Sequence, residues 1–308
     1  MKKVIIIAGQ TATGKSEIAF NLASELNGEI INADSIQVYK YFDIGSAKPP
    51  IEYRNKISHH LIDILEPNED FNAYIFKKLA EDKVDLICSK NKVPIIVGGT
   101  GLYIRCFLYG LFEQNDRVIK EARKFWEEKL KEQGLQKLYV ELLKIDPESA
   151  HKIHPNDRIR IIRALEFYTA SGEKLSQMHK KFSFQESPYD FIILIPFFEK
   201  DILLKRIEER TKKIFKEGII DETRKIIELF GTNIKPLKSI GYKEALMFIE
   251  GKISFDEAIN LTIKSTKEYA KRQKIWFKKE KNIELIDANY RDHLKIFLEK
   301  AKKFLHNN

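Results

Sequence analysis

Residues 9–16 of this chain read Gly-Gln-Thr-Ala-Thr-Gly-Lys-Ser and match the pattern G-x-x-x-x-G-K-[ST] without a mismatch. The β-branched run of residues 4–8 stands directly before this loop and predicts a buried strand. Apolar residues then recur on one helical face until Asn27-Gly28 ends the pattern. A strand, this loop and a helix in that order predict a site that binds two or more linked phosphates.

The residue types in the loop suit an anion cradle. Glycines let the backbone fold around the phosphates, and the loop N–H groups and the start of the helix point at them. Lys15 adds a full positive charge, and the Ser16 hydroxyl is expected to hold a magnesium ion against the same phosphates. The residues expected to contact the linked phosphates are Gly9, Gln10, Thr11, Ala12, Thr13, Gly14, Lys15 and Ser16.

Strands and helices alternate in the first third of the chain. Residues 29–33 and 92–97 read as apolar strands, and residues 73–89 between them carry a helical stripe. This alternation predicts a parallel sheet covered by helices, with ligands at the carboxyl ends of its strands. Asp34 and Thr100 both follow such strand ends.

The pattern from residue 116 to residue 183 is helical and lacks strands. The expected helices cover residues 123–133, 135–143 and 156–171, and a strand pattern returns at 189–196 before further helices. We therefore predict an α/β fold, a P-loop NTPase-like parallel sheet flanked by helices, with an inserted all-helical domain. The predicted domains are residues 1–115 with 184–308, and residues 116–183.

The 308-residue chain has a net charge of +9, and the excess is unevenly placed. Residues 1–115 hold 13 basic and 14 acidic side chains, whereas residues 116–308 hold 41 basic and 31 acidic ones. A neutral phosphate-binding part joined to a basic remainder favours a small phosphorylated ligand plus a larger polyanion such as RNA. A lysine-rich proteome is the alternative explanation.

Targeting signals and cysteine chemistry are not indicated. The first apolar run has no small-residue cleavage site, and no apolar stretch approaches about 18 residues. We therefore expect neither export nor membrane insertion, and a cytoplasmic protein. The two cysteines, Cys88 and Cys106, are too few for a disulfide framework or a cysteine-based zinc site.

Asp34 is the acidic residue best placed to act beside the loop. It directly follows the strand at 29–33, whereas the strands at 92–97 and 189–196 end without a carboxylate. The chain also lacks the guanine-reading segment Asn-Lys-x-Asp. Asp34 is therefore a magnesium ligand, a general base for a nucleophile beside the phosphates, or a turn residue.

Further segments along the chain carry a family resemblance. They are residues 9–16, Asp34-Ser35-Ile36-Gln37-Val38-Tyr39, Asp43-Ile44-Gly45-Ser46-Ala47-Lys48-Pro49, His59-His60-Leu61-Ile62-Asp63-Ile64, Gly98-Gly99-Thr100-Gly101-Leu102-Tyr103, His154-Pro155-Asn156-Asp157, Ser239-Ile240-Gly241-Tyr242-Lys243 and Tyr269-Ala270-Lys271-Arg272-Gln273. In order and spacing they resemble the bacterial tRNA dimethylallyltransferase family, over nearly the whole chain.

The resemblance implies transfer of a dimethylallyl group from dimethylallyl diphosphate to the exocyclic amine of adenosine 37, which follows the anticodon in tRNA. That amine is a poor nucleophile, so a base that removes its proton helps, and Asp34 suits this role. The charge that develops on the leaving diphosphate would be neutralised by the loop amides, Lys15, Mg²⁺ and Arg210. Thr100 would orient the amine or the diphosphate. A solvated helix face is the alternative reading of Arg210, and a turn residue that of Thr100.

The resemblance also implies three groups of tRNA contacts. The adenosine must leave its stack, and Gln37 offers the paired donor and acceptor that read an adenine edge. The expected contacts near this base are Asp34, Ser35, Ile36, Gln37 and Thr100. Those in the helical insertion are Arg123, Ile159, Arg160, Ile161, Ile162 and Arg163, and those in a later basic segment are Lys238, Gly241, Tyr242 and Lys243.

Three other functions are compatible with the loop. A small-molecule kinase would bind ATP there, but the sequence offers no evident pocket for the nucleotide base. A non-catalytic RNA-binding protein would bind RNA and release no diphosphate. A transferase that prenylates free adenine nucleotides would need neither the helical insertion nor the basic final two-thirds. We expect the tRNA enzyme to work as a monomer.

Overall fold

The computed structural model describes residues 1–110, 116–183, 186–290 and 292–307. The chain divides into two compact units, one formed by Met1–Leu108 with Pro188–Asn308 and the other by Tyr109–Ser187. The predicted domain boundaries at residues 115 and 184 lie outside the described residues.

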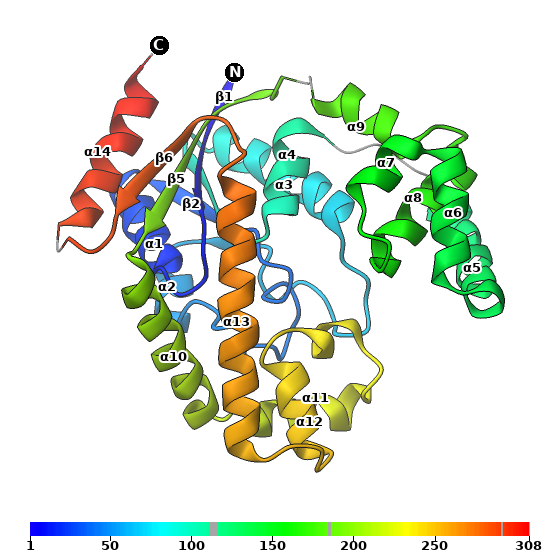
Figure 1. The fold of residues 1–308 in the computed structure, drawn as a ribbon. Helices are drawn as coiled ribbons and strands as arrows, with labels where there is room; N and C mark the ends of the chain where they lie inside the picture. Colours follow the sequence, from blue (N-terminus) through cyan, green and yellow to red (C-terminus); the bar gives the residue numbers. More distant parts are fainter. Residues whose placement is uncertain (111–115, 184–185, 291, 308) are drawn as a thin grey trace. The chain divides into compact units, whose positions relative to one another are not determined.

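A parallel sheet of six strands organises the first unit, in the order β3-β2-β4-β1-β5-β6 (Figure 1). The strands are β1 (Lys2–Ala8), β2 (Gly28–Asn32), β3 (His59–His60), β4 (Val93–Gly98), β5 (Tyr189–Phe197) and β6 (Ile283–Asp287). In the register of β1, Ile5 lies opposite Ile95 of β4 and Ile192 of β5. The predicted parallel α/β sheet is confirmed.

The strand order explains why the carboxyl end of β1 is a ligand site. The chain passes from β1 over β4 to reach β2, and it passes from β4 over β1 to reach β5. Such a reversal leaves a crevice where helices diverge to opposite faces of the sheet. The ends of β1, β2 and β4 therefore bring the loop 9–16, Asp34 and Gly98-Gly99 to one edge.

Helices cover the sheet and continue through the second half of this unit. They are α1 (Lys15–Glu25), α2 (Ile51–Lys56), α3 (Ala73–Ser89), α4 (Gly101–Tyr109), α10 (Lys200–Glu217), α11 (Ile219–Phe230), the 3-10 helix η1 (Lys235–Lys238), α12 (Tyr242–Ile249), α13 (Phe255–Phe277) and α14 (His293–His306). The long helix α13, orange in Figure 1, packs against α10 and α12.

The core of the first unit lies between the central strands and the helices α1 and α14. Ile5 and Ile95 of the sheet pack there with Leu22 of α1 and Phe297 of α14, and all are at most 2% exposed. Both faces of β1 are covered, which explains why residues 4–8 form a continuous apolar run instead of an alternating one.

The second unit is helical throughout its described residues, and the predicted all-helical insertion is confirmed. Its helices are α5 (Asp116–Gln133), α6 (Leu135–Ile145), α7 (Pro147–Lys152), α8 (Arg158–Ser171) and α9 (Leu175–Ser183). Leu142, Ile161 and Phe167 are fully buried in its own hydrophobic core. Asp157 caps α8 by accepting a hydrogen bond from the Arg160 N–H, and Gly172 ends it in a left-handed conformation.

Two strands depart from the sequence-based expectations. The strand β3 was not predicted because its two residues are too few to show a period. The edge strand β6 was not predicted because the region after β5 reads as helical. None of the helices in the described ranges combines the length and the apolarity needed to cross a membrane.

Candidate active site

The loop between β1 and α1 has the backbone of an anion cradle. Gly9 and Gly14 have φ angles of 124° and 81°, in the region that glycine adopts most readily, and Ala12 has a φ angle of 63°. The Thr13 hydroxyl donates a hydrogen bond to the Gln10 carbonyl over 2.8 Å and braces the loop from inside. Helix α1 begins at Lys15, so its unpaired N–H groups face the loop interior.

Two cationic side chains converge at this loop. The Lys15 ammonium group donates to the Gln10 carbonyl, and Arg210 Nη1 of α10 lies 3.2 Å from Thr11 Oγ1. Desolvation and, to a smaller extent, nearby Arg210 lower the pKa of Lys15 to about 7, and Asp34 opposes the shift. Desolvation also lowers the pKa of Arg210. Two desolvated cationic groups this close together favour the binding of an anion between them.

Arg206 lies one turn before Arg210 and has a different role. Its Nε donates to the Ala12 carbonyl over 2.8 Å, and its guanidinium stacks 4.4 Å from the centre of the Phe198 ring. Arg206 therefore fixes the loop backbone from outside. Arg210 is the arginine of this helix that lines the cavity beside the loop.

Asp34 sits in a short turn after β2. Its Oδ1 accepts hydrogen bonds from the N–H groups of Ile36 at 2.8 Å and Gln37 at 3.2 Å. Both bonds end on Oδ1, so they fix the orientation of the carboxylate, and neither bond uses Oδ2. The charge of Asp34 acts on both Lys15 and Arg210, and a carboxylate with a fixed orientation is a candidate general base.

Thr100 follows β4 and begins helix α4. Its carbonyl accepts the first helical hydrogen bond, from the Tyr103 N–H over 2.9 Å. The hydroxyl of Tyr269 on α13 reaches the same turn: burial raises the pKa of Tyr269 to about 12, and hydrogen bonds with Thr100 and Gln273 oppose this shift. Thr100 thus lies beside the neutral hydroxyl of Tyr269, and the turn that carries Thr100 is packed against α13.

Two cavities meet at these residues. One, of about 330 Å³, is lined by the phosphate loop, Asp34 and Gly98-Gly99, and the other, of about 290 Å³, by Asp34, Ile207 and Tyr242 among others. Thr11, Asp34, Arg210 and Tyr269 line both. The cavity beside the phosphate loop and the second, more apolar cavity therefore share a wall, and this wall carries the Asp34 carboxylate and the Arg210 guanidinium.

The residues predicted at the target base take different positions around these cavities. Ser35 and Ile36 line the cavity of about 290 Å³. Gln37 is 9% exposed, and its Nε2 donates to the carbonyls of Ser46 at 3.1 Å and Ala47 at 3.2 Å, which leaves the amide oxygen as its free recognition group. Gln37 therefore also holds the loop of residues 43–47.

The segment 238–243 contributes to the cavity of about 290 Å³ through Lys238, Gly241 and Tyr242, whereas Lys243 is exposed and pairs with Glu244. The Tyr242 side chain is fully buried, and its hydroxyl donates to Glu222 over 2.6 Å. Burial, followed by the Glu222 charge, raises the pKa of Tyr242. Tyr242 is held in place as a neutral wall residue.

Glu222 of α11 was missed by the sequence analysis. Its carboxylate accepts hydrogen bonds from the N–H groups of Asp43, Ile44 and Gly45, at 3.0, 2.8 and 3.1 Å. One side chain thus fixes three successive amides of the loop that in turn holds Gln37. A glutamate in an amphipathic helix resembles any solvated residue, so no local signal in the sequence marks it.

Oxygen donors for a magnesium ion are present in the cavity of about 330 Å³, where Ser16 and Asp34 both line the wall. Across the described ranges, no three His, Cys, Asp or Glu side chains are grouped to hold a metal. Magnesium keeps several waters and commonly binds through one or two protein oxygens plus substrate phosphates. The donor set therefore fits a magnesium ion that is bound together with a diphosphate.

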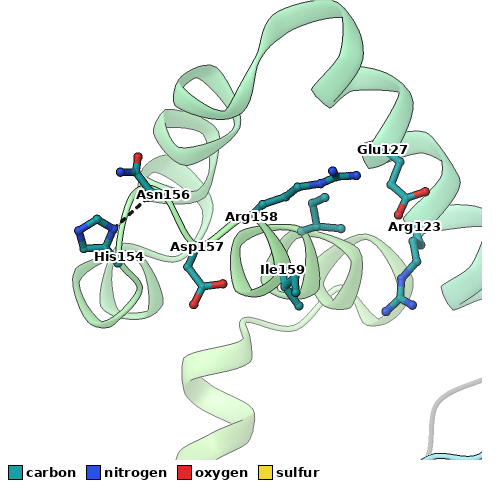
Figure 2. Close-up of a pocket in the computed structure, with 8 residues that line it drawn as sticks. Arg123, Glu127, His154, Asn156, Asp157, Arg158 and Ile159 are labelled. Atoms are coloured by element: carbon teal, nitrogen blue, oxygen red, sulfur yellow. Dashed lines mark hydrogen bonds between the residues drawn. The ribbon is translucent and has the colours of Figure 1, made fainter. Parts of the chain in front are cut away.

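The helical unit has a cavity of its own, of about 770 Å³, lined by both cationic and acidic side chains (Figure 2). Arg123 and Glu127 of α5 lie on one side of it, and Arg158 and Ile159 at the start of α8 lie on another. Ile159 is 80% exposed, and His154 Nδ1 accepts a hydrogen bond from the Asn156 N–H over 3.1 Å. This cavity therefore places two arginines and an exposed apolar side chain beside two carboxylates.

A buried carboxylate organises two of the predicted tRNA contacts. Glu166 is fully buried and accepts from Arg123 Nε at 2.7 Å, from Arg123 Nη2 at 2.9 Å and from Arg163 Nη1 at 2.6 Å. Arg160 is more exposed and lies 3.5 Å from Asp157. Ile161 and Ile162 point into the helical core, so they support the surface from below.

The chain is similar to known proteins over nearly its whole length. The model of the family described as IPP transferase matches residues 37–280, and that of the family described as Isopentenyl transferase matches residues 2–62. The chain is 41% identical to the tRNA dimethylallyltransferase of Finegoldia magna over 309 residues, which covers 99% of this chain and 98% of that protein.

Solved structures are similar over the same extent. The crystal structure of a tRNA delta(2)-isopentenylpyrophosphate transferase from Staphylococcus epidermidis matches with 36% identity and a TM-score of 0.72, over 99% of both chains. A crystallographic study of a eukaryotic dimethylallyltransferase acting on tRNA gives a match with 28% identity and a TM-score of 0.86, over 100% of this chain and 80% of that chain.

Proposed function

This chain belongs to the IPP transferase family, and we propose that it transfers the dimethylallyl group of dimethylallyl diphosphate to the exocyclic amine of the adenosine that follows the anticodon in tRNA. The observation that carries the proposal is the shared wall of the two cavities. Asp34 and Arg210 stand on that wall, so a base and a leaving-group cation face the same space.

The loop 9–16 is the proposed cradle for the diphosphate leaving group. When the carbon–oxygen bond breaks, negative charge develops on the diphosphate oxygens, and preorganised donors stabilise it most effectively in a desolvated site. The N–H groups of the loop, Lys15 and Arg210 supply these donors. A magnesium ion held by Ser16 together with the diphosphate would add further neutralising charge.

Asp34 is the proposed general base. The amine of adenine is weakly nucleophilic, so removing its proton as the new carbon–nitrogen bond forms lowers the barrier. Oδ1 is already fixed by two backbone N–H groups, which presents Oδ2 to the incoming amine. Thr100 and Gln37 would orient the adenine. Thr100 would do so through its hydroxyl at the end of β4, and Gln37 through its buried side-chain amide.

The helical unit is proposed to bind the anticodon stem-loop. Arg123, Arg160 and Arg163 would contact its phosphates, and exposed Ile159 would contact an unstacked base. Such contacts position the RNA while the flipped adenosine is read in the first unit. We expect a cytoplasmic monomer that requires Mg²⁺.

Nucleoside analysis tests this function directly. The protein is incubated with Mg²⁺ and dimethylallyl diphosphate, and with either an anticodon stem-loop, the same stem-loop with inosine at the target position, or AMP. Prenylated adenosine should form only with the unsubstituted stem-loop, because inosine lacks the exocyclic amine. Product from AMP would support a nucleotide prenyltransferase, and phosphate transfer from ATP would support a kinase.

A further inference from the structure

Helix α13 contacts both halves of the proposed catalytic centre through one face. Tyr269, Gln273 and Trp276 are spaced as i, i+4 and i+7, so they lie on the same side of the helix. This side faces the turn that follows β4: a Cβ on Gly101 would lie 2.2 Å from the Trp276 ring, and the Tyr269 hydroxyl donates to the Gly99 carbonyl over 3.4 Å. The helix is therefore packed directly on the segment that carries Thr100.

Gln273 makes the central contacts of this face. Its side-chain oxygen accepts a hydrogen bond from the Thr11 N–H at 2.8 Å, and its Nε2 donates to the Gly99 carbonyl at 3.0 Å. The side chain is 4% exposed, so no bulk water competes for either group. One amide thus joins the phosphate loop to the turn at the end of β4.

The surrounding contacts hold Gln273 in this bridging position. Gln10 of the loop donates to the Ala270 carbonyl over 3.1 Å, and Ala270 packs with Ala12, Leu203 and Ile207. A Cβ on Gly99 would lie 2.1 Å from Gln273 Nε2, while its next nearest neighbours are 3.4 Å and 3.5 Å away. Glycine at position 99 is therefore required by the Gln273 amide and by little else.

We propose that Gln273 is a positioning residue of the transfer reaction, which sets the distance between the diphosphate cradle and the Thr100 turn. The inference rests on the proposed function. Both ends of the Gln273 amide are used within the protein, so it acts through Thr11 on the leaving-group side and through Gly99 on the side of the nucleophile. Reacting groups must be held in near-attack geometry, so loosening this bridge lowers the rate of transfer more than it weakens the binding of either substrate.

The first test replaces the amide with a side chain of similar volume. Gln273→Met removes both hydrogen bonds, and we expect kcat to fall by about 100-fold while KM for dimethylallyl diphosphate changes by less than about threefold. Phe297→Leu in the distant core is the matched control, since it lowers stability without touching the site. At equal fractions of folded protein, the control should keep kcat within about twofold of wild type.

A double-mutant cycle then tests the contact itself. Gly99→Ala should lower kcat by about tenfold in the wild-type background, because the new methyl group displaces the Gln273 amide, and it should have almost no further effect after Gln273→Ala. Additive effects would overturn the proposal, as would a wild-type kcat in Gln273→Met. If Gln273→Ala does not fold, the kinetics of Gln273→Met decide the proposal without the cycle.

Amide hydrogen exchange separates this inference from the proposed function. In Gln273→Met, peptides from residues 9–16 should exchange faster than in wild type, while peptides from the helical unit should not. Unchanged exchange in the loop would overturn the bridging role. If wild-type protein yields no prenylated tRNA, the proposed function fails, but the exchange result still decides whether Gln273 holds the loop.

Discussion

The Arg210 guanidinium donates a hydrogen bond to the Thr11 hydroxyl over 3.2 Å and thereby places a cation of α10 against the phosphate loop. Helix α10 begins about 190 residues after that loop in the sequence, yet it completes the loop's positive wall. The same cation lies close to Asp34. In the proposed reaction, leaving-group binding by Arg210 and proton removal by Asp34 are therefore coupled electrostatically.

Replacing Arg210 should weaken both diphosphate binding and transfer. Arg210→Ala removes a desolvated donor aimed at the developing charge, and we expect kcat/KM to fall by about 100- to 1,000-fold. Lys205→Ala on the same helix is the control, because Lys205 is exposed and pairs loosely with Glu209 at 3.9 Å. Steady-state kinetics of both variants would check this, and equal effects would contradict a specific role for Arg210.

Asp34→Asn separates the base from the turn that it stabilises. The amide oxygen can still accept from the N–H groups of Ile36 and Gln37, so the loop should keep its fold. Without a proton acceptor, kcat should fall by about 100- to 10,000-fold. Calorimetry should find diphosphate binding retained, and Asp190→Asn, remote from the site, should change neither quantity. A variant with wild-type turnover would rule out Asp34 as the base.

The Lys15 ammonium group should make diphosphate binding dependent on pH. Desolvation lowers the pKa of Lys15 to about 7 in the ligand-free protein, so the side chain loses its charge as the pH rises through that value. A bound diphosphate favours the charged form, and binding at pH values above the lowered pKa must therefore take up a proton and grow weaker as the pH rises further.

Calorimetry in two buffers of different ionisation enthalpy measures this proton uptake. We expect about one proton per diphosphate bound at a pH one unit above the lowered pKa. Lys15→Met should bind more weakly and should lose the uptake. Equal uptake in wild type and Lys15→Met would assign the proton to another group.

Arg160 offers the clearest test of the helical unit as an RNA surface. It is exposed and makes only a loose pair with Asp157, so Arg160→Ala should leave the melting temperature unchanged. If it contacts one phosphate, stem-loop affinity should fall and the slope of log K against log salt should decrease by about one. Lys144→Ala on α6 is the exposed control, and a slope equal to that of wild type would contradict the phosphate contact.

Local patterns predicted the parts of the fold that form from contiguous residues. The central strand β1 is buried on both faces, so its continuous apolar run is sufficient to predict it without knowledge of the neighbouring strands. The strand β3 spans only His59 and His60, too short to show a period. The edge strand β6 leaves Leu285 65% exposed, so its residues do not alternate as a half-buried strand does.

The residues of the candidate site also fall into two groups: those that local sequence patterns predict, and those that only the tertiary structure shows. Asp34 and Thr100 were predicted because both follow strands, where topology places ligands. Gln273 lies 262 residues from Thr11, and no local spacing reports a contact over that separation. Glu166 and Glu222 were missed for a related reason: helical glutamates are usually solvated, and only the tertiary structure shows that these two hold arginines and backbone amides.

The balance between diphosphate release and prenylation is the most direct test of the account. Wild-type protein with Mg²⁺, dimethylallyl diphosphate and an excess of anticodon stem-loop should release one diphosphate for each prenylated adenosine, and almost none without RNA. This result would establish diphosphate as the leaving group of an RNA-dependent prenyl transfer, which is the reaction that the account assigns to the loop 9–16. Stem-loop binding with no diphosphate release, or phosphate transfer from ATP with no prenylated adenosine, would contradict it.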